Sequence, residues 1–390
     1  MRLKSVLPVT LGAAVFGLLA VGSSRPVLAD GLARQECRED WFPKDLPAVC
    51  PFKPGPRLPS PRTYHASAAT ANAIYVAGGY VFDGKDVHYL DDLLYARIGA
   101  GGTLGDWVSS PQRFTRGRSG LGLAALGKCL FLAGGSSVAD GKPQYADDVQ
   151  WSELNANGLP GAWRTSSQRL AVARSNATLL AYVGASGNFL YLVGGVTQIG
   201  PDTVHLDDVE YARVNADCST SAWSRAAFHL HGGRSSPQAV LLDDQVAVIG
   251  GWGDVDAVDV YSDVELARIR PEGGLEPWRV ASTRLPTGLY GHATVVGTST
   301  GGPSLLLALG GQPGSGAYSN WLAYAYWFPK SPIINSITQW SVAPVGRLPT
   351  ARAGHSAHLV NGFLYVIGGT TAGGQYLDEV LQSRVSAGEP

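Results

Sequence analysis

The sequence predicts an all-β protein built from one repeated unit, and two observations indicate this. A short apolar segment that ends in a Gly-Gly pair occurs six times in the 390-residue chain. Fifty glycines and twenty-four prolines accompany a single methionine, a composition typical of many short strands joined by tight turns. Long helices are therefore not expected.

Each apolar segment is predicted to be a buried strand followed by a turn that needs unusual backbone angles. The segments are 73–79 (AIYVAGG), 129–135 (CLFLAGG), 189–195 (FLYLVGG), 245–251 (QVAVIGG), 305–311 (LLLALGG) and 363–369 (FLYVIGG). Their second glycines are 56, 60, 56, 60 and 58 residues apart. A period of this length indicates a repeat architecture.

A second strand follows each Gly-Gly pair after a variable polar loop, and acidic residues open it in five copies. These strands are 90–98 (LDDLLYARI), 146–154 (ADDVQWSEL), 206–214 (LDDVEYARV), 261–269 (YSDVELARI), 319–327 (SNWLAYAYW) and 377–385 (LDEVLQSRV). Five copies then reach a tryptophan 27 to 29 residues after the second glycine, at Trp107, Trp163, Trp223, Trp278 and Trp340. The next copy begins eleven or twelve residues later, usually with an arginine.

Four strands in each of six copies predict six small twisted sheets around an axis, which is a six-bladed β-propeller. The glycine pair, the later tryptophan and the opening arginine resemble the kelch repeat, and the resemblance covers essentially the whole chain after its N-terminal signal. We therefore expect residues 30–390 to form one propeller domain. Blade five departs from the pattern, because Leu289 replaces the arginine and Asn320 and Trp321 replace the acidic pair.

The sixth copy ends before its tryptophan, which would fall near position 397. An open blade would leave a bare strand edge. Kelch propellers are closed by a strand from one terminus, and the N-terminal segment around Trp41 offers a sixth tryptophan. We predict that this segment pairs with residues 377–385, so that residues 30–61 form the closing strand and its linker.

The N-terminus indicates export. Arg2 and Lys4 precede an apolar run over 6–21 and a small-x-small cleavage pattern that ends at Ala29, which predicts a signal peptide over residues 1–29. A retained membrane anchor is the alternative, but the run is short for a span. We expect a secreted or periplasmic protein without a membrane span after cleavage.

Four cysteines in an exported chain suggest disulfides. Cys37 and Cys50 are close enough in sequence to close a short loop, whereas the pairing of Cys129 with Cys218 is left open. The net charge of −1 gives no case for nucleic acid or a membrane surface as partner. The sequence carries no metal-type cysteine spacing and no cofactor motif, so no cofactor, no metal and a monomer are expected.

Five arginines that open the copies are expected around the axis on one face, which also carries the loops that join each apolar segment to the acidic strand after it. They are Arg62, Arg118, Arg174, Arg234 and Arg352. A ring of guanidinium groups suits carboxylates or sulfates. The favoured alternative is a set of structural ion pairs, with partners at Asp92, Asp148, Asp208, Asp263 and either Asp378 or Glu379.

Two further sets share a register. An aromatic set before the acidic pairs suits contacts with sugar or protein, although each ring could simply pack on its own loop. This set is Tyr89, Tyr145, His205, Tyr318 and Tyr376. His65, His292 and His355 occur in blades one, five and six; we expect them to point between blades and pack there rather than bind a metal.

The favoured function is a non-catalytic, exported binding module for a protein or a glycan, acting through the face that carries these loops. The alternative is a carbohydrate-active enzyme, since the chain distantly resembles the kelch-type sialic-acid mutarotases. Mutarotation needs an acid and a base near the sugar ring oxygen, and Glu379 is the only candidate for such a group.

Overall fold

The computed structural model describes residues 48–253, 260–297, 303–314, 317–328, 337–343 and 346–386. The chain divides into two compact units, residues 1–36 and 37–390, and every described residue belongs to the second. In these ranges the regular structure is almost entirely β, with one 3-10 turn, η2 (Ala100–Gly102). No helix in the described ranges has the length and hydrophobicity needed to cross a membrane.

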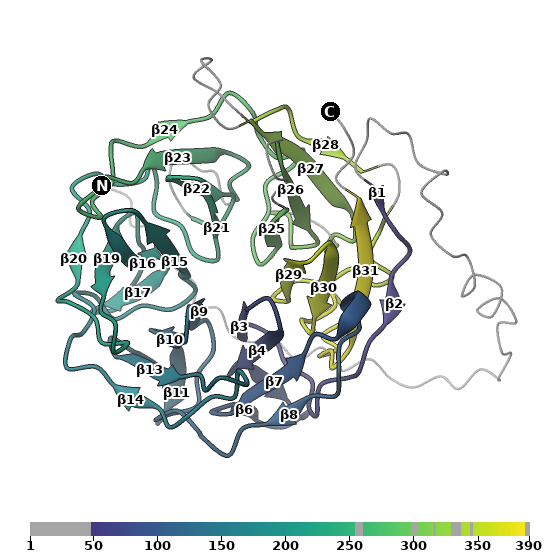
Figure 1. The fold of residues 1–390 in the computed structure, drawn as a ribbon, viewed down its shortest axis with the longest axis horizontal. Helices are drawn as coiled ribbons and strands as arrows, with labels where there is room; N and C mark the ends of the chain where they lie inside the picture. Colours follow the sequence, from purple (N-terminus) through teal and green to yellow (C-terminus); the bar gives the residue numbers. More distant parts are fainter. Residues whose placement is uncertain are drawn as a thin grey trace, which may run out of the picture. The chain divides into compact units, whose positions relative to one another are not determined.

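Six antiparallel sheets stand in a ring, each with its first strand nearest the axis (Figure 1). We call the sheets blades one to six and their strands a, b, c and d from the axis outward. Blade one is β3 (Ala66–Ala69), β4 (Ala73–Ala77), β7 (Leu93–Arg97) and β8 (Val108–Ser109). Blade two is β9 (Gly122–Leu126), β10 (Cys129–Ala133), β13 (Val149–Glu153) and β14 (Arg164–Thr165). Blade three is β15 (Thr178–Gly184), β16 (Gly187–Val193), β19 (Val209–Val214) and β20 (Ser224–Arg225).

Blade four is β21 (Gln238–Leu242), β22 (Gln245–Ile249), β23 (Val264–Arg268) and β24 (Arg279–Val280). Blade five is β25 (Ala293–Gly297), β26 (Ser304–Leu309), β27 (Leu322–Trp327) and β28 (Ser341–Val342). Blade six is β29 (Ser356–Val360), β30 (Phe363–Ile367) and β31 (Val380–Ser386), completed by strands from the other end of the chain. The predicted six-bladed propeller is therefore confirmed.

Blades one, two and three extend their b–c loops into two-stranded hairpins. The hairpins are β5 (Tyr80–Phe82) with β6 (Val87–Tyr89), β11 (Ser136–Ala139) with β12 (Lys142–Tyr145), and β17 (Val196–Ile199) with β18 (Asp202–His205). They project on the face that also carries the connections from strand d to the next strand a. We call this the loop face.

The N-terminal segment closes blade six. Strand β1 (Ala48–Val49) pairs with Val385 and Ser386, and β2 (Lys53–Pro54) pairs with Leu381 and Gln382 (Figure 1). Closure by an N-terminal strand was predicted, but the pairing that the structure shows lies at residues 48–54. Trp41, on which the prediction was centred, is outside the described residues, as are Cys37 and the predicted signal peptide.

The core lies between neighbouring blades. Six clusters of buried apolar side chains fill the six spaces, so each blade packs on both of its faces. This is why every residue of strand β4 is buried although it alternates between two faces. In blade five, Tyr324 and Tyr326 contact the cluster shared with blade six, whereas Trp327 packs toward blade four, as strand alternation predicts.

The Gly-Gly pairs adopt the unusual angles that the sequence predicts, because both glycines have positive φ in all six copies. A Cβ atom on Gly78 would come within 2.6 Å of the Arg118 carbonyl oxygen of the next blade. The neighbouring Gly79 also has no Cβ atom, and its N–H donates a hydrogen bond to the Arg118 carbonyl oxygen at 2.9 Å. The glycine pair therefore lets adjacent blades approach through their backbones.

A disulfide joins blades two and three. Cys129, at the start of β10, is bonded to Cys218, in the turn between strands c and d of blade three. The sequence had left this pairing open. Cys50 is also disulfide-bonded, while the predicted partner Cys37 lies outside the described residues, so the Cys37 and Cys50 pairing stays a prediction.

Candidate functional site

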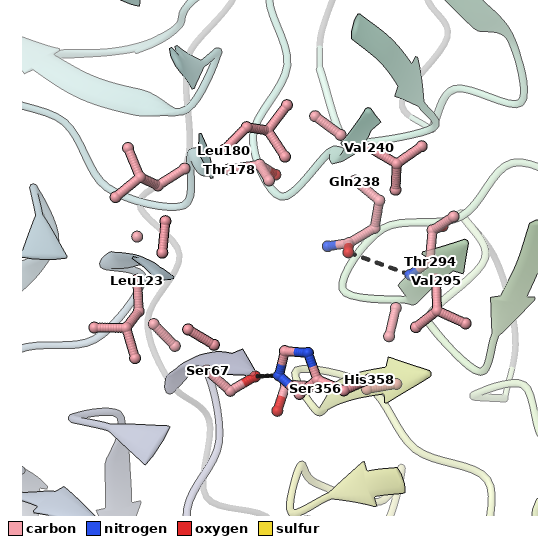
Figure 2. A pocket seen from close by; sticks show the side chains of 18 of the residues that line it. Ser67, Leu123, Thr178, Leu180, Gln238, Val240, Thr294, Val295, Ser356 and His358 are labelled. Carbon is pink, nitrogen blue, oxygen red and sulfur yellow. Dashed lines mark hydrogen bonds between the residues drawn. The ribbon is translucent and has the colours of Figure 1, made fainter. Parts of the chain in front are cut away.

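A cavity of about 580 Å³ runs along the axis of the ring. The six a strands line it, and most of its side chains are small or aliphatic (Figure 2). Polar contacts also cross between blades there: for example, Ser67 Oγ lies 2.7 Å from His358 Nε2, and Thr294 N–H donates to Gln238 Oε1 at 3.3 Å. This volume falls within the usual range for small-molecule sites.

A belt of backbone hydrogen bonds surrounds the cavity at its loop-face end. The belt residue lies just before strand a in each blade and has a positive φ, between 48° and 62°. These residues are Tyr64, Gly120, Asn176, Ser236, Gly291 and Gly354. Five N–H groups, those of residues 354, 64, 120, 176 and 236, each donate to the belt carbonyl of the preceding blade, over 2.6 to 2.9 Å. The bonds link all six blades in one series from blade five to blade four.

The five arginines of the predicted ring lie beside this belt and are buried, with at most 2% of each exposed. Each donates to the carbonyl oxygen of the first glycine of its own doublet. Arg62, Arg118, Arg174 and Arg234 also form ion pairs with Asp92, Asp148, Asp208 and Asp263 over 2.6 to 2.8 Å, and Arg352 pairs with Glu379. The predicted structural ion pairs are therefore present, and the guanidinium groups form their hydrogen bonds and ion pairs within their own blades.

Two of these pairs have a second buried carboxylate. Glu210 lies 2.5 Å from Arg174 and Glu265 lies 2.5 Å from Arg234, and both carboxylates are fully buried. Sequence analysis did not find them, although each stands two residues after the aspartate and so on the same side of strand c. In blade two the same position is Gln150, which donates to Asp148 Oδ2 at 2.6 Å.

Burial and charge act in opposite directions on the pKa of Asp148. For Asp148, removal from water favours the neutral acid, but the hydrogen bonds and charge of Arg118 outweigh that effect and lower the pKa. The pair is therefore ionised at neutral pH. Blade five lacks the pair altogether: Leu289 is buried in the core cluster of blades four and five, and Trp321 packs against the same cluster.

Six tyrosines gather on the loop face, and we call them the tyrosine cluster; Tyr64 among them also lines the cavity. They come from blades one, five and six: Tyr64, Tyr80, Tyr89, Tyr290, Tyr318 and Tyr376. Tyr80 is at the centre, since its ring stacks on Tyr64 at 6.2 Å and contacts Tyr89 at 6.0 Å and Tyr376 at 5.7 Å between centroids. All six rings are partly exposed.

Two more rings extend this cluster through blade four to blade three. Trp252 contacts Tyr290 at 6.0 Å and His205 at 4.9 Å, and 44% of Trp252 is exposed. The result is an aromatic arc over five of the six blades. Among the described ring contacts, none joins Tyr145 of blade two to this arc.

The structure thus brings together four of the five aromatic candidates from the sequence. Sequence analysis missed Tyr64, Tyr80, Tyr290 and Trp252. Tyr80 and Trp252 directly follow the Gly-Gly pair, in blades one and four only, so they produce no periodic signal. Their signal was positional: the residue after the glycine pair forms a bridge with the residue before the belt position, for example Thr63 with Tyr80.

The three histidines at the shared register pack between blades, as predicted. A Cβ atom on the first glycine of the preceding blade would come within 3.0 Å of each imidazole: Gly368 for His65, Gly250 for His292 and Gly310 for His355. Burial lowers the pKa of His65 and His292 to about 3. Within the described ranges, no group of three His, Cys, Asp or Glu side chains is arranged to hold a metal ion.

Comparison with known proteins supports the fold. The sequence matches no family model, and no curated protein sequence matches it. The fold is that of a six-bladed β-propeller, and the paired arginines agree with the resemblance to the kelch repeat. Among solved structures, that of YjhT is similar, with a TM-score of 0.61 and 16% sequence identity over 85% of this chain and 99% of that chain. At this identity the likeness concerns the fold alone.

Proposed function

We propose that the protein is an exported, non-catalytic binding module that recognises a protein or a glycan through its loop face. The observation that carries this proposal is the contrast between two neighbouring layers. The arginines are buried and each is paired with a carboxylate, whereas the aromatic rings above them are partly exposed. A surface of this kind offers contact area and neutral hydrogen bonds rather than acid–base groups.

Export is supported by the Cys129–Cys218 disulfide, because such bonds persist mainly in oxidising compartments. The predicted signal peptide agrees with this. The proposed binding residues are those of the aromatic arc that the sequence indicated, Tyr89, His205, Tyr318 and Tyr376.

A glycan array probed with the mature chain, residues 30–390, tests the proposal. We expect binding that Trp252→Ala reduces at least tenfold, since this residue is the most exposed ring of the arc. Binding that is equal for both proteins would place the ligand elsewhere and contradict the proposal.

One observation favours an enzyme as the second candidate. Glu379 pairs with Arg352 and its side chain is 26% exposed, so one carboxylate beside a guanidinium can be reached from solvent. An NMR assay of anomer exchange on sialic acid, comparing the wild type with Glu379→Gln, tests this candidate. Exchange that the variant abolishes would establish catalysis and refute the non-catalytic module.

A further inference from the structure

We infer that the loop face over blades four and five binds an acidic segment of a partner protein, through Arg284, Arg347 and the aromatic rings beside them. This inference rests on the proposed binding function and specifies its site and its partner. Three observations carry it: two arginines lack an ion pair that forms at the same position in the other blades, a long part of the chain has no acidic residue, and partly exposed rings lie next to both arginines.

An arginine or a histidine occupies the same position on every connection that leads into strand a of the next blade. The residue after it is buried and apolar, and the N–H of that residue donates to a carbonyl oxygen just before strand c, over 2.8 to 3.3 Å. This backbone bond makes the six positions equivalent. The six side chains are Arg57, Arg113, Arg169, His229, Arg284 and Arg347, and the residues opposite them, in the same order, are Asp378, Asp91, Asp147, Asp207, Ser262 and Asn320.

An ion pair forms wherever the residue opposite is acidic. The pairs are Arg57 with Asp378 at 2.5 Å, Arg169 with Asp147 at 2.6 Å, His229 with Asp207 at 2.8 Å, and Arg113 with Asp91. In blades four and five the residue opposite is uncharged. Arg284 and Arg347 therefore have no ion pair among the described residues, and both are exposed. A guanidinium group in this situation can form bidentate hydrogen bonds with a carboxylate of another molecule.

The chain around the two arginines is poor in acidic residues. Residues 277–377 contain no Asp or Glu, although the whole chain has 31, and they contain five Lys or Arg. This stretch supplies both connections, all of blade five except its neighbours' contacts, and the first two strands of blade six. Blade four also carries aspartates at 254, 256 and 259, outside the described residues, so each arginine is tested on its own. A surface with one sign of charge attracts and orients a partner of the opposite sign.

Partly exposed rings flank both arginines. Tyr290 follows Arg284 on the same connection, and its ring lies 6.0 Å from that of Trp252, which is 44% exposed. Tyr318 lies on the b–c loop of blade five, and the backbone after Arg347 is hydrogen-bonded to the end of that loop. Arginine, tryptophan and tyrosine are the side chains most enriched at the energetic centres of protein interfaces. The combination therefore favours a protein as partner.

The two arginines stand on different connections, with blade five between them, so a ligand that uses both must carry more than one anionic group. An acidic peptide segment meets this requirement, because it bears carboxylates on several residues and apolar side chains that pack on the rings. A sugar with a single carboxylate can pair with only one arginine. An anionic polysaccharide has the charges but no large apolar side chains for the rings.

Selection of peptides from a library of short random sequences, on the immobilised mature chain, tests the inference. We expect the selected peptides to carry at least two Asp or Glu residues together with an apolar one. Calorimetry measures their affinity, which should fall when NaCl is raised from about 50 mM to about 500 mM, because salt screens exposed charges. An oligomer of polygalacturonate is the competing probe, and it should bind more weakly than the peptides.

Five variants assign the site. Arg284→Gln and Arg347→Gln should each weaken peptide binding about fivefold, and together about twentyfold. Ser262→Asp and Asn320→Asp keep the arginines but supply the acid that the other four blades have, so each should weaken binding as much as the change of the arginine opposite. Arg169→Gln is the matched control, because Arg169 has the same position in blade two and is already paired, and it should change affinity less than about twofold. Thermal unfolding of each variant confirms that it is folded.

Three results would overturn the inference and differ in what they leave standing. Selected peptides that lack acidic residues, or that bind the arginine variants as tightly as the wild type, refute the site and the partner class; the proposed function stands if Trp252→Ala weakens their binding. If polygalacturonate binds through the two arginines and no peptide is selected, the partner class is wrong but the loop-face function stands. If neither probe binds, the inference fails, and the proposed function then depends on the glycan array alone.

Discussion

Replacement of Glu210 by glutamine removes a charge from the interior of blade three without changing the shape of the side chain. Glu210 is fully buried and accepts three hydrogen bonds, from Ala171 N–H at 2.6 Å, Val172 N–H at 3.1 Å and Arg174 Nη2 at 2.5 Å. A glutamine keeps one acceptor oxygen and turns an NH2 group toward the remaining donor. With its oxygen at the Oε1 position, the glutamine keeps the bonds from Val172 and Arg174 as neutral bonds, and its NH2 group opposes the Ala171 N–H, while Arg174 keeps Asp208.

Bonds to charged groups contribute about 1.5–3 kcal/mol each, and breaking a buried pair costs about 3–5 kcal/mol. Because two neutral bonds remain, we expect Glu210→Gln to destabilise the protein by about 3 kcal/mol, at the lower end of this range. For a unit of about 340 residues, an unfolding entropy of about 2.1 cal/mol/K per residue converts this into a fall in Tm of about 4 °C. Urea unfolding and calorimetry measure both quantities.

Blade two supplies the rescue. There Gln150 is the native residue, and its amide donates to Thr115 Oγ1 at 2.9 Å. Thr115 lies three residues before its arginine, as Ala171 does, and Ala171 is exposed enough to accept a larger side chain. In the Glu210→Gln background, Ala171→Thr should raise the free energy of unfolding by at least about 1 kcal/mol more than the same substitution does in the wild type. A glutamine variant within about 0.5 kcal/mol of the wild type, or a threonine effect equal in both backgrounds, would refute the reasoning.

Three other predictions concern the disulfide, the buried histidines and the closing strand. Replacing Cys129 and Cys218 by alanine removes a cross-link between residues 89 apart, and the chain-entropy model predicts a loss of stability of about 4–5 kcal/mol. A urea midpoint equal to that of the wild type would contradict this prediction. Burial lowers the pKa of His292 to about 3, so its contribution to stability is complete above about pH 6.5 and declines as the pH falls. In His292→Leu, Tm should therefore fall less between pH 7 and pH 5 than it does in the wild type. An equal fall in both proteins would contradict this prediction. Val49→Asp should destabilise by more than about 3 kcal/mol because Val49 is buried at the closure, whereas Val108→Asp on the exposed outer strand of blade one should change stability by less than about 0.5 kcal/mol, as unfolding curves will show.

The blades were predictable because their signal repeats. Six copies of an apolar segment with a glycine pair indicate the same strand and turn, so the prediction does not depend on any single irregular copy. The closing strands were harder to find. Strand β2 consists of Lys53 and Pro54 only, and two residues cannot show the alternation that identifies a strand.

The candidate site was only partly predictable, for a related reason. A binding surface on a repeat protein depends on how the copies differ, whereas periodicity reports what they share. Tyr80 stands where other blades have Ser136, Val196 or Thr370, and the sequence alone does not show that it meets Tyr376 of another blade. The ion pairs were easier, because opposite charges recurred in the same relative register.

The closing strands β1 and β2 are synthesised early, but they can pair only after the end of the propeller has been synthesised. Residues 48–54 are among the first of the described part to emerge, yet their partners in β31 are among the last. The bond from Ser383 Oγ to the Cys50 carbonyl spans 333 residues, and bringing such distant ends together has a chain-length entropy cost of about 5 kcal/mol. Residues 48–54 must therefore wait, unpaired, until β31 has been synthesised.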